Sequence, residues 1–222
     1  MIPRALVALL LAGPMSALAQ EAAAPLPSLS EVVNGRHEVV VYRGRRALRL
    51  VPAPELAGRD ANVLGILDGA EFRNGTIEID VAGAPRPDAP ADSRGFVGIS
   101  FRTGPHASWS EVFYLRPLNG RAEDQLRRNR AVQYAFDPDF PWHRLRRESP
   151  GQYESYVDLE AGAWTRLRIE VSGSTARLFV NGATQPTLVV TELKGGDRAG
   201  RIALWAHVET DAHFAGIRVT PR

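Results

Sequence analysis

The chain has 222 residues, of which 44% are hydrophobic and 23% charged, and it contains no cysteine. This length suits one domain with its own core, and the composition excludes a disordered or fibrous chain, a disulfide scaffold and a thiol nucleophile. Of the 27 basic residues Lys194 is the only lysine, and the formal net charge of +2 argues against a general nucleic-acid-binding protein.

The first residues have the pattern of a secretory signal peptide. Arg4 supplies a positive start, residues 5–12 are apolar, and Ala17-Leu18-Ala19 forms a cleavage motif before Gln20. We therefore predict a signal peptide over residues 1–19 and a periplasmic or secreted bacterial protein. Residues 20–30 are predicted to be a flexible lead-in and residues 31–222 one domain, without a membrane span.

Most of the remaining chain alternates between polar and apolar residues with a period of two, which is typical of strands. Turn signals such as Ser172-Gly173-Ser174 and Asn181-Gly182 separate these stretches. In chain order, strands are predicted over residues 37–42, 47–51, 63–67, 76–81, 96–103, 112–118, 132–136, 153–157, 166–171, 177–180, 187–191, 201–208 and 213–219. Many short strands with such turns predict an all-β fold, a two-sheet antiparallel sandwich or jelly roll.

One segment departs from the strand pattern. Residues 121–130 contain no β-branched residue, are rich in helix formers, and follow the turn signal Asn119-Gly120. We predict one short helix here, within a long excursion between two strands.

The last third of the chain resembles the closing strands of the concanavalin A-like lectin/glucanase superfamily, in its laminin-G-like and 3-keto-disaccharide hydrolase-like branches. The resemblance is carried by four motifs: Trp164-x-x-Leu167-x-Ile169-x-Val171-x-Gly173, Leu178-Phe179-Val180-Asn181-Gly182, Gly200-x-Ile202-Ala203-Leu204-Trp205 and Phe214-Ala215-Gly216-Ile217-Arg218-Val219. It implies two antiparallel sheets, one curved, with a carbohydrate site often on the concave face. It does not imply catalysis, because lectins and hydrolases share this scaffold.

A local positive field lies in the middle of the chain. Eight arginines and four acidic residues fall between residues 116 and 147, which gives this block a charge of +4. On a helix Arg121, Asp124, Gln125 and Arg128 would share one face. That face could be a solvated surface with an Asp124–Arg128 pair, or it could bind sugar hydroxyls beside the aromatic residues nearby.

Strand alternation indicates a second set of candidates. Trp205 and His207 alternate away from the apolar face of their strand, as do Arg102 on residues 96–103 and Tyr114 and Arg116 on residues 112–118. If these strands share a sheet, the five side chains lie on one face, where a sugar site could form.

The leading hypothesis is an exported carbohydrate-active jelly roll, a monomer that binds a glycoside. Asp124 or Glu123 would act as general acid or base if it cleaves the glycoside, with a 3-keto sugar among the candidate substrates. The predicted substrate-binding residues are Arg102, Tyr114, Arg116, Asn119, Arg121, Gln125, Arg128, Asn129, Gln133, Tyr134, Trp142, Tyr153, Trp205 and His207. The alternatives are a non-catalytic glycan- or envelope-binding module and a structural protein that docks a partner through its arginine block.

No cofactor is expected from the sequence. The histidines show no paired ligand spacing, so no metal site is predicted. Related domains often hold a structural Ca²⁺ near the last strand, but Ala215 stands where they commonly carry an acid. Glu78 and Asp80, which resemble part of a glycosidase motif, are interpreted as the ordinary polar face of a strand.

Overall fold

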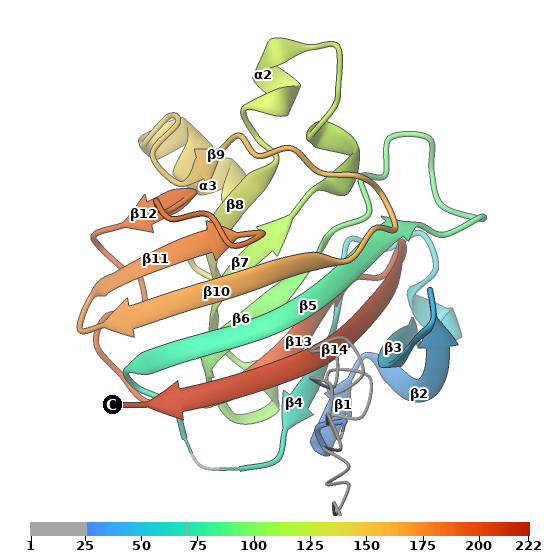
Figure 1. The fold of residues 1–222 in the computed structure, drawn as a ribbon, viewed down its shortest axis with the longest axis horizontal. Coiled ribbons are helices and arrows are strands. Elements are labelled where there is room, and N and C mark those ends of the chain that lie inside the picture. Colours follow the sequence, from blue (N-terminus) through green and yellow to red (C-terminus); the bar gives the residue numbers. More distant parts are fainter. Residues whose placement is uncertain (1–25, 70) are drawn as a thin grey trace, which may run out of the picture.

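The computed structural model describes residues 26–69 and 71–222 (Figure 1). The predicted signal peptide, 1–19, lies outside the described residues, as does most of the predicted lead-in. Strand β1 (Leu29–Val33) begins inside that lead-in, one residue before its predicted end. The reason is that β1 pairs with β4 (Asn62–Leu67), where the glycine at 65 leaves room for the Leu29 side chain.

The strands form two seven-stranded antiparallel sheets in the described part of the chain, and Figure 1 shows one layered on the other. Sheet A has the order β1, β4, β13 (Arg201–His207), β6 (Val97–Thr103), β7 (Ser110–Leu115), β8 (Val132–Asp137) and β9 (Glu154–Ser155). Sheet B has the order β12 (Leu188–Val190), β11 (Thr175–Val180), β10 (Thr165–Ser172), β5 (Gly75–Pro85), β14 (Thr210–Pro221), β3 (Arg45–Pro52) and β2 (Gly35–Tyr42). This confirms the predicted all-β sandwich, and every predicted strand is present with ends shifted by a few residues.

The core lies between the two sheets. Ile99 and Phe113 are cross-strand partners on the inner face of sheet A, and Ile79 and Leu167 are partners on the inner face of sheet B. All four side chains are buried. Burying a side chain of this size contributes about 1.5–3 kcal/mol, so this interior stabilises the sandwich without disulfides.

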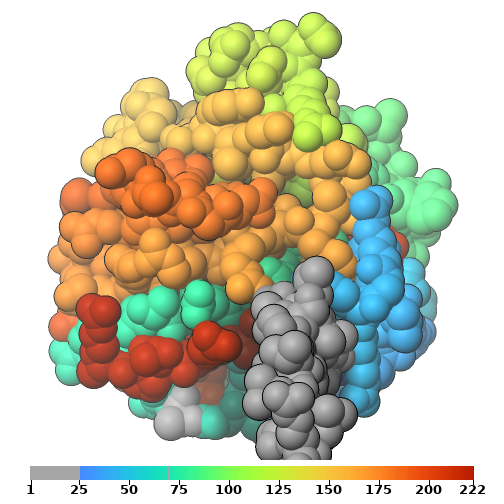
Figure 2. Space-filling model, viewed as in Figure 1, coloured from blue at the N-terminus to red at the C-terminus, as the bar shows by residue number. Residues whose placement is uncertain are grey.

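The helices of the described residues are short and lie outside the sheets. They are α2 (Gln125–Arg128), α3 (Trp142–Glu148) and the 3-10 turns η1 (Pro54–Leu56), η2 (Pro105–Ala107) and η3 (Pro117–Asn119). The predicted helix over 121–130 is reduced to α2, and α3 was not predicted. Figures 1 and 2 show the segment with α2 (yellow-green) protruding from one end of the sandwich. Within the described ranges no helix is both long and apolar enough to cross a membrane.

Candidate functional site

A row of side chains crosses the outer face of sheet A, the face turned away from sheet B. Trp205 lies opposite Leu64 and Gly98, Gly98 lies opposite Tyr114, and Tyr114 lies opposite Gln133. Directly paired residues point to the same side of a sheet. Trp205, Tyr114 and Gln133 therefore share this outer face, as the alternation predicted for the first two.

The glycine in this row lets two aromatic rings meet. Gly98 separates the strands that carry Trp205 and Tyr114, and the two rings stack across it with centroids 4.7 Å apart and planes 29° apart. A Cβ atom at Gly98 would lie only 2.1 Å from the carbonyl oxygen of Phe113. The stacked pair therefore depends on a glycine at this position.

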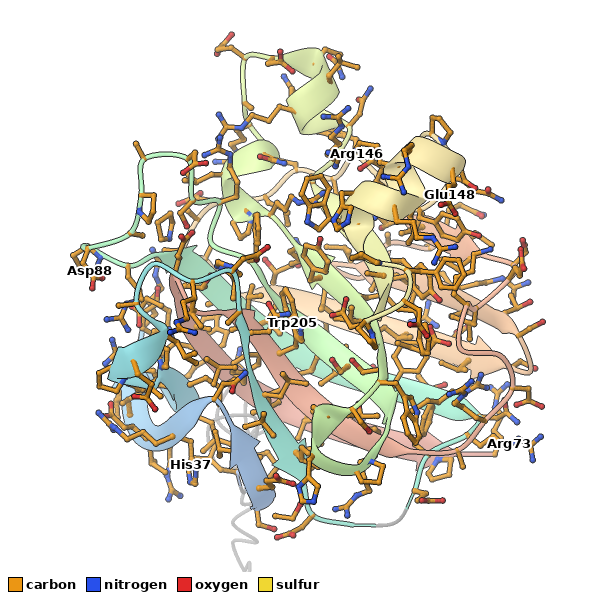
Figure 3. The ribbon with its side chains drawn as sticks, turned by 180° about the vertical axis from the view of Figure 1, so that it is seen from behind. His37, Arg73, Asp88, Arg146, Glu148 and Trp205 are labelled. Carbon is orange, nitrogen blue, oxygen red and sulfur yellow. The ribbon has the colours of Figure 1, made fainter. Side chains whose placement is uncertain are left out.

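Two adjoining hollows open above these rings. One, of about 180 Å³, is lined by Asp60, Asn62, Phe96, Tyr114, Ala135, Asp137, Pro141, Trp142, His143, Trp205 and His207. The other, of about 510 Å³, shares Asp60, Asn62, Asp137 and Trp205 with it. We call the two together the Trp205 groove; Figure 3 shows Trp205 near the middle of sheet A. Its size is in the range of small-ligand sites, roughly 300–1,000 Å³.

Two carboxyl groups lie where the hollows meet. Asp137 is the last residue of β8, and its partly buried carboxyl has no hydrogen-bond or ion-pair partner among the described residues. Burial, and after it the negative charge of Asp60, raise the pKa of Asp137 to about 6. Asp60 itself is exposed. The groove thus contains a carboxyl that can hold a proton near neutral pH.

His207 connects Asp60 to the sheet. Its Nε2 lies 3.3 Å from Oδ1 of Asp60, while its Nδ1 accepts a hydrogen bond of 3.4 Å from the backbone N–H of Glu209. A ring nitrogen that accepts leaves the proton on the other nitrogen in a neutral imidazole. His207 is therefore arranged to donate to Asp60.

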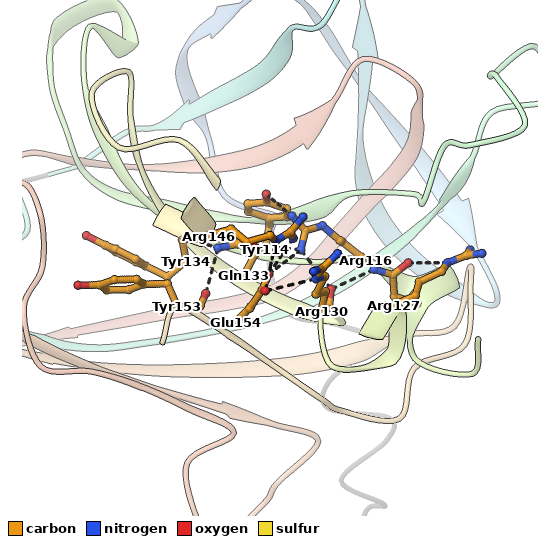
Figure 4. A network of polar contacts seen from close by, with 10 residues as sticks. Tyr114, Arg116, Arg127, Arg130, Gln133, Tyr134, Arg146, Tyr153 and Glu154 are labelled. Atoms are coloured by element: carbon orange, nitrogen blue, oxygen red, sulfur yellow. Dashed lines mark hydrogen bonds and ion pairs between the residues drawn. The ribbon is translucent and has the colours of Figure 1, made fainter. Parts of the chain in front are cut away.

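A buried network of hydrogen bonds and ion pairs surrounds Arg116, beside the groove (Figure 4). Arg116 donates to the Tyr114 hydroxyl at 3.0 Å and to Oε1 of Gln133 at 3.1 Å, and its guanidinium lies 5.7 Å from the ring centroid of Trp142. The Glu154 carboxylate lies 3.9 Å from the Arg116 guanidinium and also pairs with Arg146, at 2.7 Å. Burial raises the pKa of Tyr114 to about 12. These contacts fix the rings of Tyr114 and Trp142, and Arg116 and Gln133 lie beside the groove rather than in its lining.

Of the predicted binding residues, four line the Trp205 groove: Tyr114, Trp142, Trp205 and His207. They come from β7, α3 and β13, segments far apart in the sequence. The structure therefore brings together three of the predicted aromatic residues and His207.

Arg102 does not lie on this face, and its predicted position beside Trp205 is wrong. The ladder between β6 and β13 is irregular here, and Arg102 has a φ of 49°, so the alternation is broken. Its fully buried guanidinium donates to the carbonyl oxygens of Arg73 at 2.7 Å, Gly173 at 2.7 Å and Gly196 at 2.6 Å. Arg102 joins turns at the end of the sandwich.

Tyr134 and Tyr153 are also misplaced by the prediction, because both point into the interior. Tyr134 alternates with Gln133 and donates to Oε2 of Glu111 at 2.5 Å. The Tyr153 ring lies 5.4 Å from the Tyr134 ring and is buried with it. Neither is accessible to a ligand in the Trp205 groove.

The segment 121–130 does not cover the sheet, and the structure gives Asp124 and Glu123 no place in the groove. Asp124 is the N-cap of α2, where its Oδ1 accepts from the Arg127 N–H at 2.6 Å, and no ion pair joins it to Arg128 within the described chain. Glu123 is exposed on the protruding end. The helix begins too late to place Arg121 on a common face with them.

The other predicted residues in this segment and just before it make local contacts and do not line the groove. Arg121 pairs with Asp158 at 2.7 Å, Gln125 donates to Asn129, Arg128 lies 3.3 Å from the Tyr156 hydroxyl, and Asn119 donates to the Arg130 carbonyl. Asn129 lines a separate shallow hollow beside Tyr156.

The groove residues that were missed from the sequence include Asp60, Asn62, Phe96, Asp137 and His143. Extending the alternation from Gln133 through Ala135 places Asp137 on the outer face. The sequence therefore did contain a signal for Asp137. Asp60 precedes β4 and His143 lies on the unpredicted α3, so neither had a usable pattern.

Glu78 and Asp80 lie on β5 in sheet B, away from the groove. The Asp80 carboxylate accepts from Arg45 at 2.7 Å and from Arg166 at 2.7 and 2.9 Å. These contacts agree with its interpretation as part of a strand's polar face. Within residues 26–69 and 71–222, no three His, Asp or Glu side chains are grouped as metal ligands.

No protein-family model matches the sequence, and no curated protein matches it. The carbohydrate-binding module CBM66 from Bacillus subtilis superposes with a TM-score of 0.56 at 13% identity, over 84% of this chain and 92% of the module. A Bacillus subtilis protein of unknown function with a galectin-like fold gives 0.54 at 11% identity, over 86% and 90%. This chain has a concanavalin A-like jelly-roll fold. The predicted superfamily resemblance is confirmed at the level of the fold, while the laminin-G-like and 3-keto-disaccharide hydrolase-like branches stay predictions.

Proposed function

We propose that this jelly roll is an exported protein that binds a carbohydrate in the Trp205 groove. The observation that carries the proposal is the meeting of aromatic rings with carboxyl, amide and imidazole groups in one groove. The C–H face of a sugar packs on an aromatic ring, and its hydroxyls exchange hydrogen bonds with such polar groups. The similarity to a carbohydrate-binding module agrees with this use of the fold.

The rings differ in how much they can contribute. Trp142 is 40% exposed, whereas Trp205 and Tyr114 are only 4% and 3% exposed. Trp142 therefore offers the stacking surface, and the other two rings form the base of the groove. Two cations fix the position of Trp142 on α3, since the guanidinium groups of Arg116 and Arg146 lie 5.7 and 4.6 Å from the centroid of its ring.

The charges of the groove favour a neutral or amino sugar. Asp60 and Asp137 line both hollows, and among the described residues that line them there is no arginine or lysine. A sugar carboxylate would meet negative charge without a compensating cation. We therefore expect uronic acids to bind worse than the matching neutral sugars.

The binding proposal is tested with a glycan array followed by calorimetry on the best oligosaccharide. Trp142→Ala should weaken binding at least tenfold, because it removes the exposed ring. Tyr156→Ala is the matched control, since Tyr156 is similarly exposed, at 43%, but lies beside the separate hollow near α2. A loss of affinity in Tyr156→Ala with none in Trp142→Ala would place the site elsewhere.

Export is tested separately by N-terminal sequencing of the protein from the periplasm or medium. Processing between Ala19 and Gln20 is the expected result, and a cytoplasmic protein that starts at Met1 contradicts it.

Docking of a partner through the arginine block receives less support. Arg121, Arg144 and Arg146 are paired with acidic residues of the same chain, at distances of 2.7 to 2.9 Å. Much of the local charge is therefore neutralised internally.

A further inference from the structure

Asp137 lies where a bound oligosaccharide would pass from one hollow to the other. It lines both hollows, together with Asp60. A ligand that fills the whole groove therefore brings one of its linkages close to these two carboxyls.

The Asp137 carboxyl differs from the other buried or half-buried carboxyls. Glu111, Asp80 and Glu154 all accept hydrogen bonds from the chain, from Tyr134, Arg166 and Arg146 respectively. Asp137 has no such partner among the described residues, although burying a carboxyl without one is unfavourable. Polar groups left unpaired in a groove are found at sites that act on ligands.

Burial and the nearby Asp60 favour the protonated form of Asp137. Asp60 adds negative charge, and His143 and His207 line the same hollow, while His106 lines the adjoining one. Burial first, and Asp60 second, raise the pKa of Asp137 to about 6. A general acid works best with a pKa near the operating pH.

We infer that the Trp205 groove cleaves the glycosidic bond of the carbohydrate it binds, with Asp137 as the proton donor and Asp60 as the base. This inference rests on the proposed carbohydrate binding. It assigns the roles of general acid and base to Asp137 and Asp60 instead of Asp124 and Glu123.

The reaction is a hydrolysis that needs only water. Asp137 gives its proton to the glycosidic oxygen while the bond from that oxygen to the anomeric carbon breaks, and the bonding electrons stay on the leaving oxygen. Water attacks the anomeric carbon, and Asp60 takes the proton that the water loses. One glycoside and one water give an alcohol, which is the leaving group, and a sugar with a free anomeric hydroxyl. Proton transfer from Asp60 through solvent restores Asp137.

His207 is a positioning residue in this scheme. The Asp60 side chain is fully exposed, and the contact of 3.3 Å from Nε2 of His207 holds it at the groove. His207→Ala should therefore lower kcat more than it raises KM, because Asp60 loses its orientation while the rings remain.

The test is release of product from a panel of nitrophenyl glycosides and of reduced oligosaccharides that the array shows to bind. Asp137→Asn should lower kcat at least a hundredfold while calorimetric affinity stays within threefold, because the amide keeps the shape but donates no carboxyl proton. Asp124→Asn is the control and should keep full activity, because Asp124 lies on the protruding end. Retained binding by Asp137→Asn also shows that the variant folds.

The outcomes separate the inference from the binding proposal. If wild-type protein binds glycans and releases no product from the panel, the inference is wrong and the binding proposal stands. Full activity in Asp137→Asn also overturns the inference. If wild-type protein binds no glycan, both fail. The kcat/KM of the active protein should fall above about pH 6, where Asp137 loses its proton, and a flat profile through that range contradicts its role as donor.

Discussion

Arg102 shows how one side chain can organise the end of a sandwich. Its guanidinium is fully buried and reaches backbone carbonyls in three separate turns, including those at Gly173 and Gly196, as well as the Asp197 carboxylate at 3.2 Å. A buried cation is tolerated when its donors are satisfied in this way. Its role is structural, although the sequence pattern placed it in the ligand site.

Arg102→Met should therefore destabilise the fold strongly. Several buried carbonyl oxygens lose their donor, and we expect the free energy of unfolding to fall by about 3 kcal/mol or more, measured by urea denaturation. Arg73→Met is the matched control, because Arg73 pairs with the same Asp197 at 2.8 Å but is exposed. Equal losses in the two variants would show that the carbonyl contacts of Arg102 are unimportant.

Glu111 should make the stability of the protein depend on pH. Burial raises its pKa from an ordinary value of 4.5 to about 7. The native state then binds more protons than the unfolded chain between these values. The free energy of unfolding therefore falls as pH rises through this window, by at most about 1.4 kcal/mol per pH unit.

The test compares urea denaturation of wild type and Glu111→Gln at pH 5, 6, 7 and 8. Other titrating groups are common to both proteins, so the difference between the two curves isolates Glu111. Its contribution should shrink steadily from pH 5 to pH 7, and parallel curves over this range would refute the prediction.

At the residue scale, alternation predicts which way a side chain points only while the ladder is regular. It correctly places Trp205, His207 and Tyr114 on the outer face of sheet A, and it fails at Arg102, where the ladder is irregular. It could also have identified Asp137, but nothing in the sequence shows that this carboxyl lacks a partner.

At the scale of elements, strands were predictable because their pattern is local, and the helices were less so. The segment 121–130 has helix formers throughout, yet Asp124 caps a helix of four residues. In α3 the N-cap is Pro141, which provides no side-chain capping bond, so no start signal marks that helix. Helix α3, which covers part of the groove, therefore could not be predicted from the sequence.

The role of Asp124 as a cap gives a prediction about α2. Asp124→Ala removes the hydrogen bond to the Arg127 N–H, and we expect a loss of about 1 kcal/mol in the free energy of unfolding or a local loosening of α2. Glycan affinity should not change. A large loss of glycan affinity, measured by calorimetry, would show that the protruding segment is part of the binding site.

At the scale of the whole molecule, the groove depends on sheet order. Asn62, Tyr114 and Trp205 lie on β4, β7 and β13, and only the order of strands in sheet A brings them to one face. Composition and alternation give the fold class, but strand order comes from tertiary packing, so the position of the hollows could not be read from the sequence.

The central proposal is that a carbohydrate occupies the Trp205 groove. The most direct measurement is an NMR titration of isotope-labelled protein with the best oligosaccharide from the array, followed at assigned side-chain signals. We predict that the signals of the Trp142 indole, the His207 ring and the Asn62 amide shift together and saturate at one affinity. Shifts confined to residues 121–130 and Tyr156, with none at Trp142 or His207, would contradict the account.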